Sequence, residues 1–112
     1  MNVLFLPEVQ KYYDHLERIL YEKGYFSYPA SSKKYVKDLI DGIRKNLPTK
    51  RHKPAPKYFD RYGKNMKYAS FKKNRHTTWY AFFKIYEENG QTFYLVRYIS
   101  NNHVIAQYLQ VS

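Results

Sequence analysis

The sequence contains no cysteine, which excludes disulfide bonds, thiolate nucleophiles and cysteine-based zinc sites. Its four glycines are spread singly along the chain, so they form no glycine-rich phosphate loop, and no Gly-x-Ser-x-Gly nucleophile motif occurs. The four histidines are scattered, and the acidic residues lie mainly in two expected helices and at Glu87-Glu88. Because a metal site needs such ligands in a cluster, we expect no bound metal and no cofactor.

Long hydrophobic runs are also missing. The apolar start MNVLFL is interrupted by Pro7 and Glu8, which makes it too short for the core of a signal peptide. No other segment approaches the roughly 18 apolar residues that are typical of a membrane span. These absences predict a soluble, cytoplasmic protein with no membrane association.

Acidic residues are scarce, since nine Asp and Glu stand against 20 Lys and Arg, and the formal net charge is +11. Between residues 44 and 75 there are twelve Lys or Arg and a single acid, Asp60, so this segment alone accounts for the whole net charge. Such an excess indicates an anionic partner, which is RNA, DNA, an anionic membrane surface or an acidic protein. The 14 tyrosines either fill the core and its rim or stack on nucleobases beside the cations.

The first part of the chain predicts a strand and a helix. The apolar run from Asn2 to Leu6 is typical of a buried strand. Pro7 suits the first turn of a helix, and Gly24 is well placed to end it. Between them, apolar residues recur every three or four positions and form one stripe of an amphipathic helix: Val9, Tyr12, Tyr13, Leu16, Ile19 and Leu20.

A second amphipathic helix is expected next, with Ser31 or Ser32 as its N-terminal cap and Pro48 as its end. Its apolar stripe consists of Val36, Leu39, Ile40, Ile43 and Leu47. Two consecutive helices with a short connection form a hairpin whose apolar faces need a sheet to cover.

Residues 48–66 carry three prolines and no long periodicity, so we expect a loop held down by a short helical turn at Tyr58, Phe59 and Tyr62. This basic loop is either a flap beside the functional site or an ordinary solvated loop.

Three strands are expected in the second half, at residues 67–73, 77–86 and 93–99. Residues 74–76 form the first turn, and Asn89-Gly90 is a strong signal of a hairpin turn. The tail after Asn101-Asn102 is a short helix or one more strand, and we favour the helix. With 112 residues, the chain predicts a single α+β domain over residues 1–112, in which the two helices pack on a small, mainly antiparallel sheet.

Phosphate chemistry without a metal is the activity that these residues allow. RNA carries its own nucleophile, the 2′-hydroxyl, so an enzyme needs cations to offset the transition-state charge and groups that move protons. The candidate catalytic residues are Arg97, His103, Tyr108, Lys72 and Arg75. The candidate nucleic-acid-binding residues are Lys73, Arg61, Lys64, Lys67 and His76. A binding face without catalysis needs the same residues.

The order of a strand, two helices, a basic loop, three strands and a tail with His and Tyr resembles the RelE/ParE superfamily of toxins from bacterial type II toxin–antitoxin systems. The segments NRHTTWYAFF and YLVRYISNNHVIAQYL are particularly similar to a branch of small toxin-like proteins in that superfamily. The resemblance covers nearly the whole chain. It implies a RelE-like β-α-α-β-β-β fold with a short C-terminal segment, and an acidic antitoxin that wraps the toxin and masks its site.

In the RelE-like branch, the resemblance implies an mRNA interferase, which is a metal-independent endoribonuclease that cleaves mRNA on the ribosome and inhibits translation. The family's catalytic positions correspond here to Lys72 or Lys73, Arg75, Arg97, and His103 or Tyr108. The chain departs from the pattern at residues 77–80, where a second strongly basic residue is usual. The strand at residues 67–73 also lacks a carboxylate that could serve as a base.

Two other functions stay open at this point. The ParE-like branch of the family inhibits DNA gyrase through protein contacts, and a non-catalytic RNA-binding domain would also carry this charge. The oligomeric state stays open too, although a toxin without its antitoxin is often a monomer.

Overall fold

Two prolines begin the two long helices of the protein. The computed structural model describes residues 2–109, and in it α1 spans Pro7–Glu22 and α2 spans Pro29–Asn46. Proline is favourable at the first helical position, where its missing N–H has no helical partner. The prediction that Ser31 or Ser32 caps this helix is wrong, because both residues lie inside the first turn of α2. The Ser32 hydroxyl instead donates a hydrogen bond of 3.0 Å to the carbonyl of Pro29.

Five strands form one mixed sheet in the order β1-β5-β4-β3-β2. The outer strand β1 (Asn2–Phe5) runs parallel to β5 (Gln91–Asn101), and the other neighbours are antiparallel. They are β4 (Thr78–Glu88), β3 (Lys67–Lys72) and the two-residue strand β2 (Lys53–Pro54). The predicted α+β class is confirmed at this level. The first strand was predicted to be buried, but only Phe5 of this edge strand is buried and Leu4 is 49% exposed.

The β4–β5 hairpin turns at Asn89 and Gly90, as expected. Both residues have positive φ angles, 52° and 78°, which a tight hairpin turn between right-twisted strands requires. The turn before β4 also forms where it was expected, because the Asn74 side chain accepts hydrogen bonds from the backbone N–H groups of His76 and Thr77, each at 2.9 Å.

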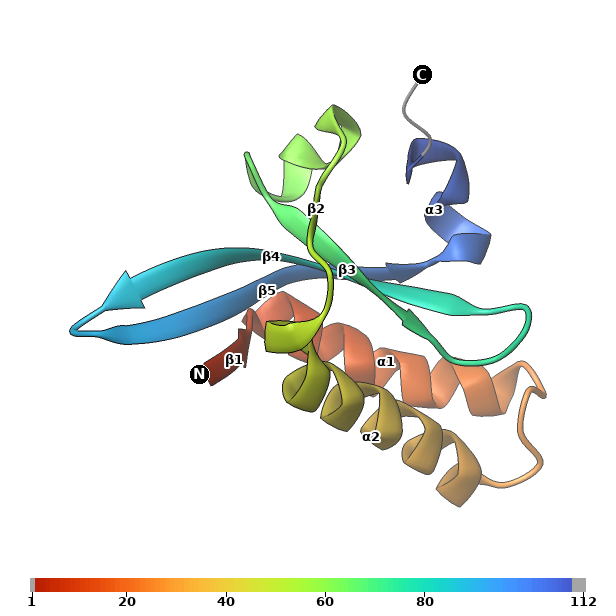
Figure 1. The fold of residues 1–112 in the computed structure, drawn as a ribbon. Helices are drawn as coiled ribbons and strands as arrows, with labels where there is room; N and C mark the ends of the chain where they lie inside the picture. The colour runs from red at the N-terminus through yellow and green to blue at the C-terminus, as the bar shows by residue number, and fades with distance from the viewer. Residues whose placement is uncertain (1, 110–112) are drawn as a thin grey trace.

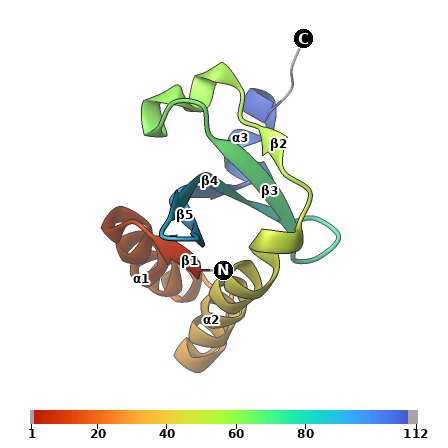
Figure 2. The same ribbon diagram turned by 60° about the vertical axis from the view of Figure 1, so that its left-hand side comes forward.

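The two faces of the sheet are covered differently (Figures 1 and 2). The helices α1 and α2 pack on one face and bury the larger apolar cluster there. The other face is covered by the short 3₁₀ helix η2 (Lys57–Tyr62) and by α3 (Asn102–Leu109), which enclose a smaller cluster around Phe59 and Phe82. The expected helical turn at Tyr58, Phe59 and Tyr62 and the expected C-terminal helix are therefore both confirmed. A second 3₁₀ turn, η1 (Leu47–Thr49), follows α2.

None of the helices in residues 2–109 is both long and apolar enough to cross a membrane.

Candidate functional site

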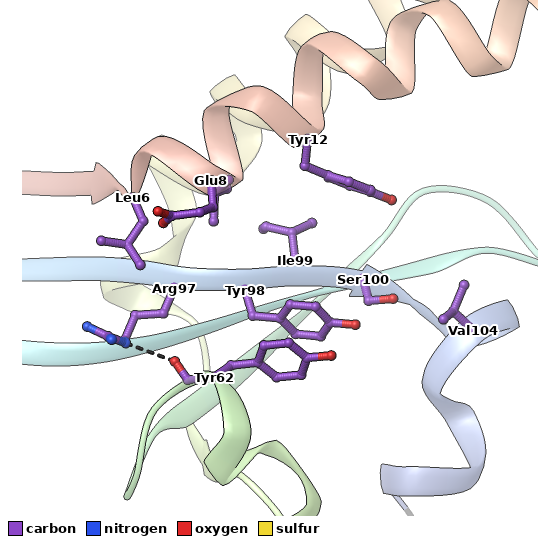
Figure 3. Close-up of a pocket in the computed structure, with 10 residues that line it drawn as sticks. Leu6, Glu8, Tyr12, Tyr62, Arg97, Tyr98, Ile99, Ser100 and Val104 are labelled. Atoms are coloured by element: carbon purple, nitrogen blue, oxygen red, sulfur yellow. Dashed lines mark hydrogen bonds between the residues drawn. The ribbon is translucent and has the colours of Figure 1, made fainter.

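A cleft opens beside β5 where its neighbour β1 stops. β1 pairs with β5 as far as Val96, and the N–H of Leu6 donates one more hydrogen bond to the carbonyl of Val96 at 3.0 Å. β5 continues for five more residues, and within the described chain no strand pairs with that stretch on the β1 side. The cleft that runs along it has a volume of about 580 Å³ (Figure 3).

Three elements wall this cleft, and most of its lining is apolar. Its floor is the consecutive stretch of β5 from Arg97 to Ser100. The first turns of α1 contribute Glu8, Val9 and Tyr12 on one side, η2 contributes Tyr62 on the other, and Val104 of α3 lies at the far end (Figure 3). The cleft is thus built by segments that are far apart in the sequence.

Arg97 lies at the start of this floor because of an irregularity in the β4–β5 ladder. Phe82 pairs with Tyr98 and Phe83 pairs with Val96, so Arg97 is an extra residue without a partner in that register. Such a β-bulge re-aims a side chain and is common beside functional sites. The Arg97 Nε atom donates a hydrogen bond of 3.0 Å to the carbonyl of Tyr62, which holds the guanidinium against η2 (Figure 3).

Gly63 makes room for this arginine. A Cβ atom at Gly63 would lie only 2.7 Å from Arg97 Nε and 3.2 Å from the sulfur of Met66. Its φ angle of +153° is also one that side-chain-bearing residues rarely adopt. Because residue 63 is glycine, the backbone after η2 approaches the Arg97 side chain this closely without a steric clash.

Two stacked tyrosines lie next to Arg97. The rings of Tyr62 and Tyr98 are parallel within 6°, with centroids 3.8 Å apart (Figure 3). Burial raises the pKa of Tyr98 to about 12, the Tyr62 hydroxyl adds to this rise, and the hydrogen bond with Ser100 opposes it. Tyr98 is therefore a protonated hydrogen-bond donor at neutral pH. Burial also raises the pKa of Tyr12 on the opposite wall, with a smaller contribution from Tyr35.

Four of the other predicted site residues gather at the β3–β4 turn. Lys72, Arg75 and His76 are exposed there. His103, at the start of α3, reaches the same turn, because its Nε2 atom lies 3.0 Å from the hydroxyl of Thr77. The structure therefore brings four of the ten predicted site residues to one end of the sheet.

Asn102 fixes this end of the molecule. Its amide nitrogen donates to the carbonyl of His76 at 3.0 Å, and its amide oxygen accepts from the N–H of Thr78 at 2.9 Å. The neighbouring Asn101 accepts a 2.9 Å hydrogen bond from the N–H of His103. Asn101 thus caps the start of α3, and the side chain of Asn102 ties α3 to the turn.

Tyr108 belongs neither to the residues around Arg97 nor to those at the β3–β4 turn. Its ring stacks on Tyr58 at a centroid distance of 3.7 Å, and the Arg61 guanidinium lies 3.9 Å from the centre of the Tyr58 ring. Lys73 lies 4.7 Å from the ring centre of Tyr35, on the side of the sheet that carries α2. Lys64 and Lys67 are exposed.

The predicted catalytic set is thus not gathered around one point. Arg97, His103 and Tyr108 contact Tyr62, Thr77 and Tyr58 respectively. Along β5, the four steps from Arg97 to Asn101 cover about 13 Å at roughly 3.3 Å per residue. One small group bound at Arg97 would therefore not also contact His103.

Sequence reasoning missed the wall residues Glu8, Tyr12 and Ser100 and the pairing of Tyr62 with Tyr98. Tyr12 was assigned to the apolar stripe of α1, and it does pack against the helix-side core. No signal in the sequence could have placed it opposite Tyr62, because their proximity depends on where β1 ends.

Among residues 2–109, no group of three or more His, Cys, Asp or Glu is placed to hold a metal ion. Comparisons with protein-family models, with curated proteins and with solved structures found no match to this chain.

Proposed function

We propose that this chain is the toxin of a type II toxin–antitoxin module and that it cleaves mRNA on the ribosome without a metal. The observation that carries the proposal is the arrangement around Arg97. A bulged arginine is anchored by the carbonyl of Tyr62 at one end of a cleft that two stacked tyrosines line, on a chain with a net charge of +11. A positioned cation of this kind suits the stabilisation of a phosphorane-like transition state.

The architecture supports the same proposal. The elements follow the order β, two helices, then strands and a C-terminal helix, and the helix pair covers one face of the sheet (Figure 1). This is the order that a RelE-like topology requires, with the short strand β2 as an addition. In this proposal the exposed cations at the β3–β4 turn bind the RNA backbone.

The reaction needs no external nucleophile. The 2′-hydroxyl of the RNA loses its proton to water, and the 2′-oxygen attacks the adjacent phosphorus. The bond to the 5′-oxygen of the next nucleotide breaks, that oxygen takes up a proton from water, and a cyclic phosphate and a 5′-hydroxyl result. In this proposal Arg97 offsets the negative charge on the phosphate oxygens. Removing one such donor from an enzyme typically lowers the rate by about 10²–10³. The Tyr62 and Tyr98 hydroxyls point away from the guanidinium, toward Ser100, so they would contact another part of the RNA (Figure 3).

An acidic antitoxin is the partner that the charge favours. Between residues 44 and 75 the chain carries twelve cations and one acid, and such a surface attracts an anionic protein as readily as RNA. In the proposed module the antitoxin covers the cleft and holds the toxin inactive in the cytoplasm.

A specific observation favours a second candidate. Arg97, His103 and Tyr108 do not converge, which suits a ParE-like gyrase inhibitor or a non-catalytic RNA-binding domain better than a concerted catalytic set.

The deciding experiment is a reconstituted translation reaction in which mRNA cleavage is mapped with and without ribosomes, for the native protein and for Arg97→Ala and His103→Ala. Cuts that require ribosomes and disappear with Arg97→Ala are the expected result. Intact mRNA and unaffected translation would overturn the nuclease, and a gyrase supercoiling assay would then test the second candidate.

A further inference from the structure

The cleft beside β5 holds charges of both signs, although the chain as a whole is strongly basic. Of the described residues that line it, Glu8 is the one acid and Arg97 is the one cation. Figure 3 shows the Glu8 carboxylate and the Arg97 guanidinium at the same end of the cleft, with the side chain of Leu6 between them. A carboxylate thus lies near the cation to which the proposed function assigns the phosphate.

An acid in this place has a structural explanation and a functional one. Glu8 lies in the first turn of α1, where a negative charge stabilises a helix by about 0.3–1 kcal/mol through the helix dipole. A carboxylate in the first turn that points to solvent gives the same stabilisation. The helix dipole therefore does not require the carboxylate to line the cleft, where it repels the phosphate of an RNA substrate.

The proposed reaction needs a group that takes the proton of the 2′-hydroxyl. Besides Glu8 and Arg97, the titratable residues that line the cleft are three tyrosines: Tyr12, Tyr62 and Tyr98. A phenol with its ordinary pKa of about 10 is protonated at neutral pH. Burial raises the pKa of Tyr12, and it raises the pKa of Tyr98 to about 12. Because arginine stays a cation, the carboxylate is the group in this lining that can accept a proton.

His103 is the other candidate for proton transfer, and it does not line the cleft. Its Nε2 atom lies 3.0 Å from the hydroxyl of Thr77, at the β3–β4 turn. The strand β3, on which a carboxylate base would be expected, contains no Asp or Glu. Neither element supplies a base beside Arg97.

The start of α1 holds Glu8 on a firm support. The N–H of Leu6 donates a hydrogen bond of 3.0 Å to the carbonyl of Val96, and Pro7 begins the helix directly afterwards. Glu8 therefore follows a junction that is tied to the strand of Arg97 itself. Catalytic groups on such supported elements are held more precisely than groups on free loops.

We propose that the Glu8 carboxylate is the general base of the RNA cleavage, an inference that rests on the proposed function. A Glu8 oxygen accepts the proton of the 2′-hydroxyl in place of water, while the 2′-oxygen forms its bond to phosphorus. The bond to the 5′-oxygen of the next nucleotide breaks, and that oxygen takes up a proton from water. Glu8 then releases its proton to water, and Arg97 offsets the charge on the phosphate oxygens throughout.

The test measures steady-state cleavage of mRNA on programmed ribosomes by the full chain. Glu8→Gln should lower kcat by about 10²–10⁴, which is the typical contribution of a general base. KM for the programmed ribosome should stay the same or fall, because the amide no longer repels the phosphate. Asp14→Asn makes the same chemical change at an exposed position of α1 outside the cleft, so this matched control should cleave at nearly the native rate.

Two further variants separate the chemistry from the stability of the helix. Glu8→Asp keeps a negative charge in the first turn of α1 but withdraws the carboxylate by one methylene group. It should fold like the native protein and cleave up to about 10²-fold more slowly, since a displacement of about 1 Å can cost that much. Glu8→Ala leaves space for formate, a small carboxylate that should raise its rate. Formate should not raise the rate of Arg97→Ala, because a carboxylate does not replace a cation.

A native kcat in Glu8→Gln would overturn the assignment and leave the nuclease standing. A raised KM with an unchanged kcat would do the same, because it indicates a loss of ground-state binding. A slow Glu8→Ala that formate does not accelerate would give Glu8 a structural role and also overturn the assignment. Absence of cleavage by the native protein would overturn the nuclease and the base together.

Discussion

The two faces of the sheet are held by different kinds of packing. On the helix side, α1 and α2 bury aliphatic residues such as Val36, Leu39 and Ile43 against the strands. On the other side, the cluster is mainly aromatic. Phe59 stacks on Phe82 at 4.3 Å, and the two stacked tyrosine pairs lie at its rim.

This difference assigns stability to one side of the sheet and the proposed function to the other. The helix-side core consists mainly of buried apolar side chains, so changes there should alter the free energy of unfolding. The aromatic side carries Arg97, several tyrosine hydroxyls and the tethered start of α3, so changes there should alter binding and chemistry. The predictions below test this separation.

The largest effect is expected in the helix-side core. Leu39 is 4% exposed, and Leu39→Ala should lower the free energy of unfolding by about 2–5 kcal/mol, because it removes buried methyl groups and leaves a cavity. Urea denaturation followed by circular dichroism measures this loss. The folded fraction of the variant should retain the cleavage activity of the native protein. A loss below about 1 kcal/mol would mean that α2 does not pack as described.

Arg97→Ala should have the opposite effects, with a large loss of activity and a small loss of stability. Ribosome-dependent cleavage should fall by about 10²–10³, because the phosphate loses its positioned cation. The free energy of unfolding should change by less than about 1.5 kcal/mol, the typical net value of one hydrogen bond. Lys84→Ala, on the neighbouring strand, is the matched control and should cleave mRNA at nearly the native rate. Equal activity of the two variants would contradict the role of Arg97.

The same separation explains what the sequence could predict. The helix-side core was predictable, because apolar residues at three- and four-residue spacing identified both helices and Asn89-Gly90 identified the hairpin. The start of α2 was predicted wrongly, because a proline at the first helical position replaced the serine cap. That error has no effect on which residues are buried.

The aromatic side was predictable only in part. The helical turn at Tyr58, Phe59 and Tyr62 was expected, but its position over β5 was not. Arg97 was selected from its sequence neighbours. Its exact placement depends on a bulge, and bulges depend on long-range pairing that no local pattern encodes. For the same reason the sequence could not indicate that Arg97, His103 and Tyr108 lie apart.

Gly63→Ala should affect both stability and activity. The new methyl group would meet the Arg97 side chain, and the positive φ would be strained by about 1–3 kcal/mol. We expect a loss of stability in that range together with a clear loss of cleavage. Gly24→Ala is the control, because Gly24 also has a positive φ, +79°, but open space around its Cβ position. A variant at Gly63 that loses stability but keeps full activity would show that the position of Arg97 tolerates displacement.

Asn102→Ala should loosen α3. The change leaves the N–H of Thr78 and the carbonyl of His76 without their side-chain partner, which typically costs about 1–3 kcal/mol. Asn101→Ala removes one hydrogen bond and should cost less. Amide exchange at residues 103–109 should increase more in the first variant than in the second. Equal exchange in both would mean that packing of Ile105, rather than the asparagine, holds the helix.

The smallest expected changes in the free energy of unfolding come from two Tyr→Phe variants, and they should differ in sign between the two sides of the sheet. Tyr13, in the helix-side core, has a buried hydroxyl with no hydrogen-bond partner among the described residues, so Tyr13→Phe should raise the free energy of unfolding by about 1 kcal/mol. The Tyr98 hydroxyl lies near those of Ser100 and Tyr62, so Tyr98→Phe removes a polar contact and should lower the free energy of unfolding by about 0.5–1.5 kcal/mol (Figure 3).

A pH series sharpens this last comparison. Because the pKa of Tyr98 rises from 10.0 in the unfolded chain to about 12 on folding, the folded state holds that proton more tightly. The resulting stability is complete below pH 10 and declines as the pH approaches 12. Chemical denaturation across this range should show a smaller decline in Tyr98→Phe than in the native protein. Parallel curves for the two proteins would mean that Tyr98 is not shielded by the packing of η2.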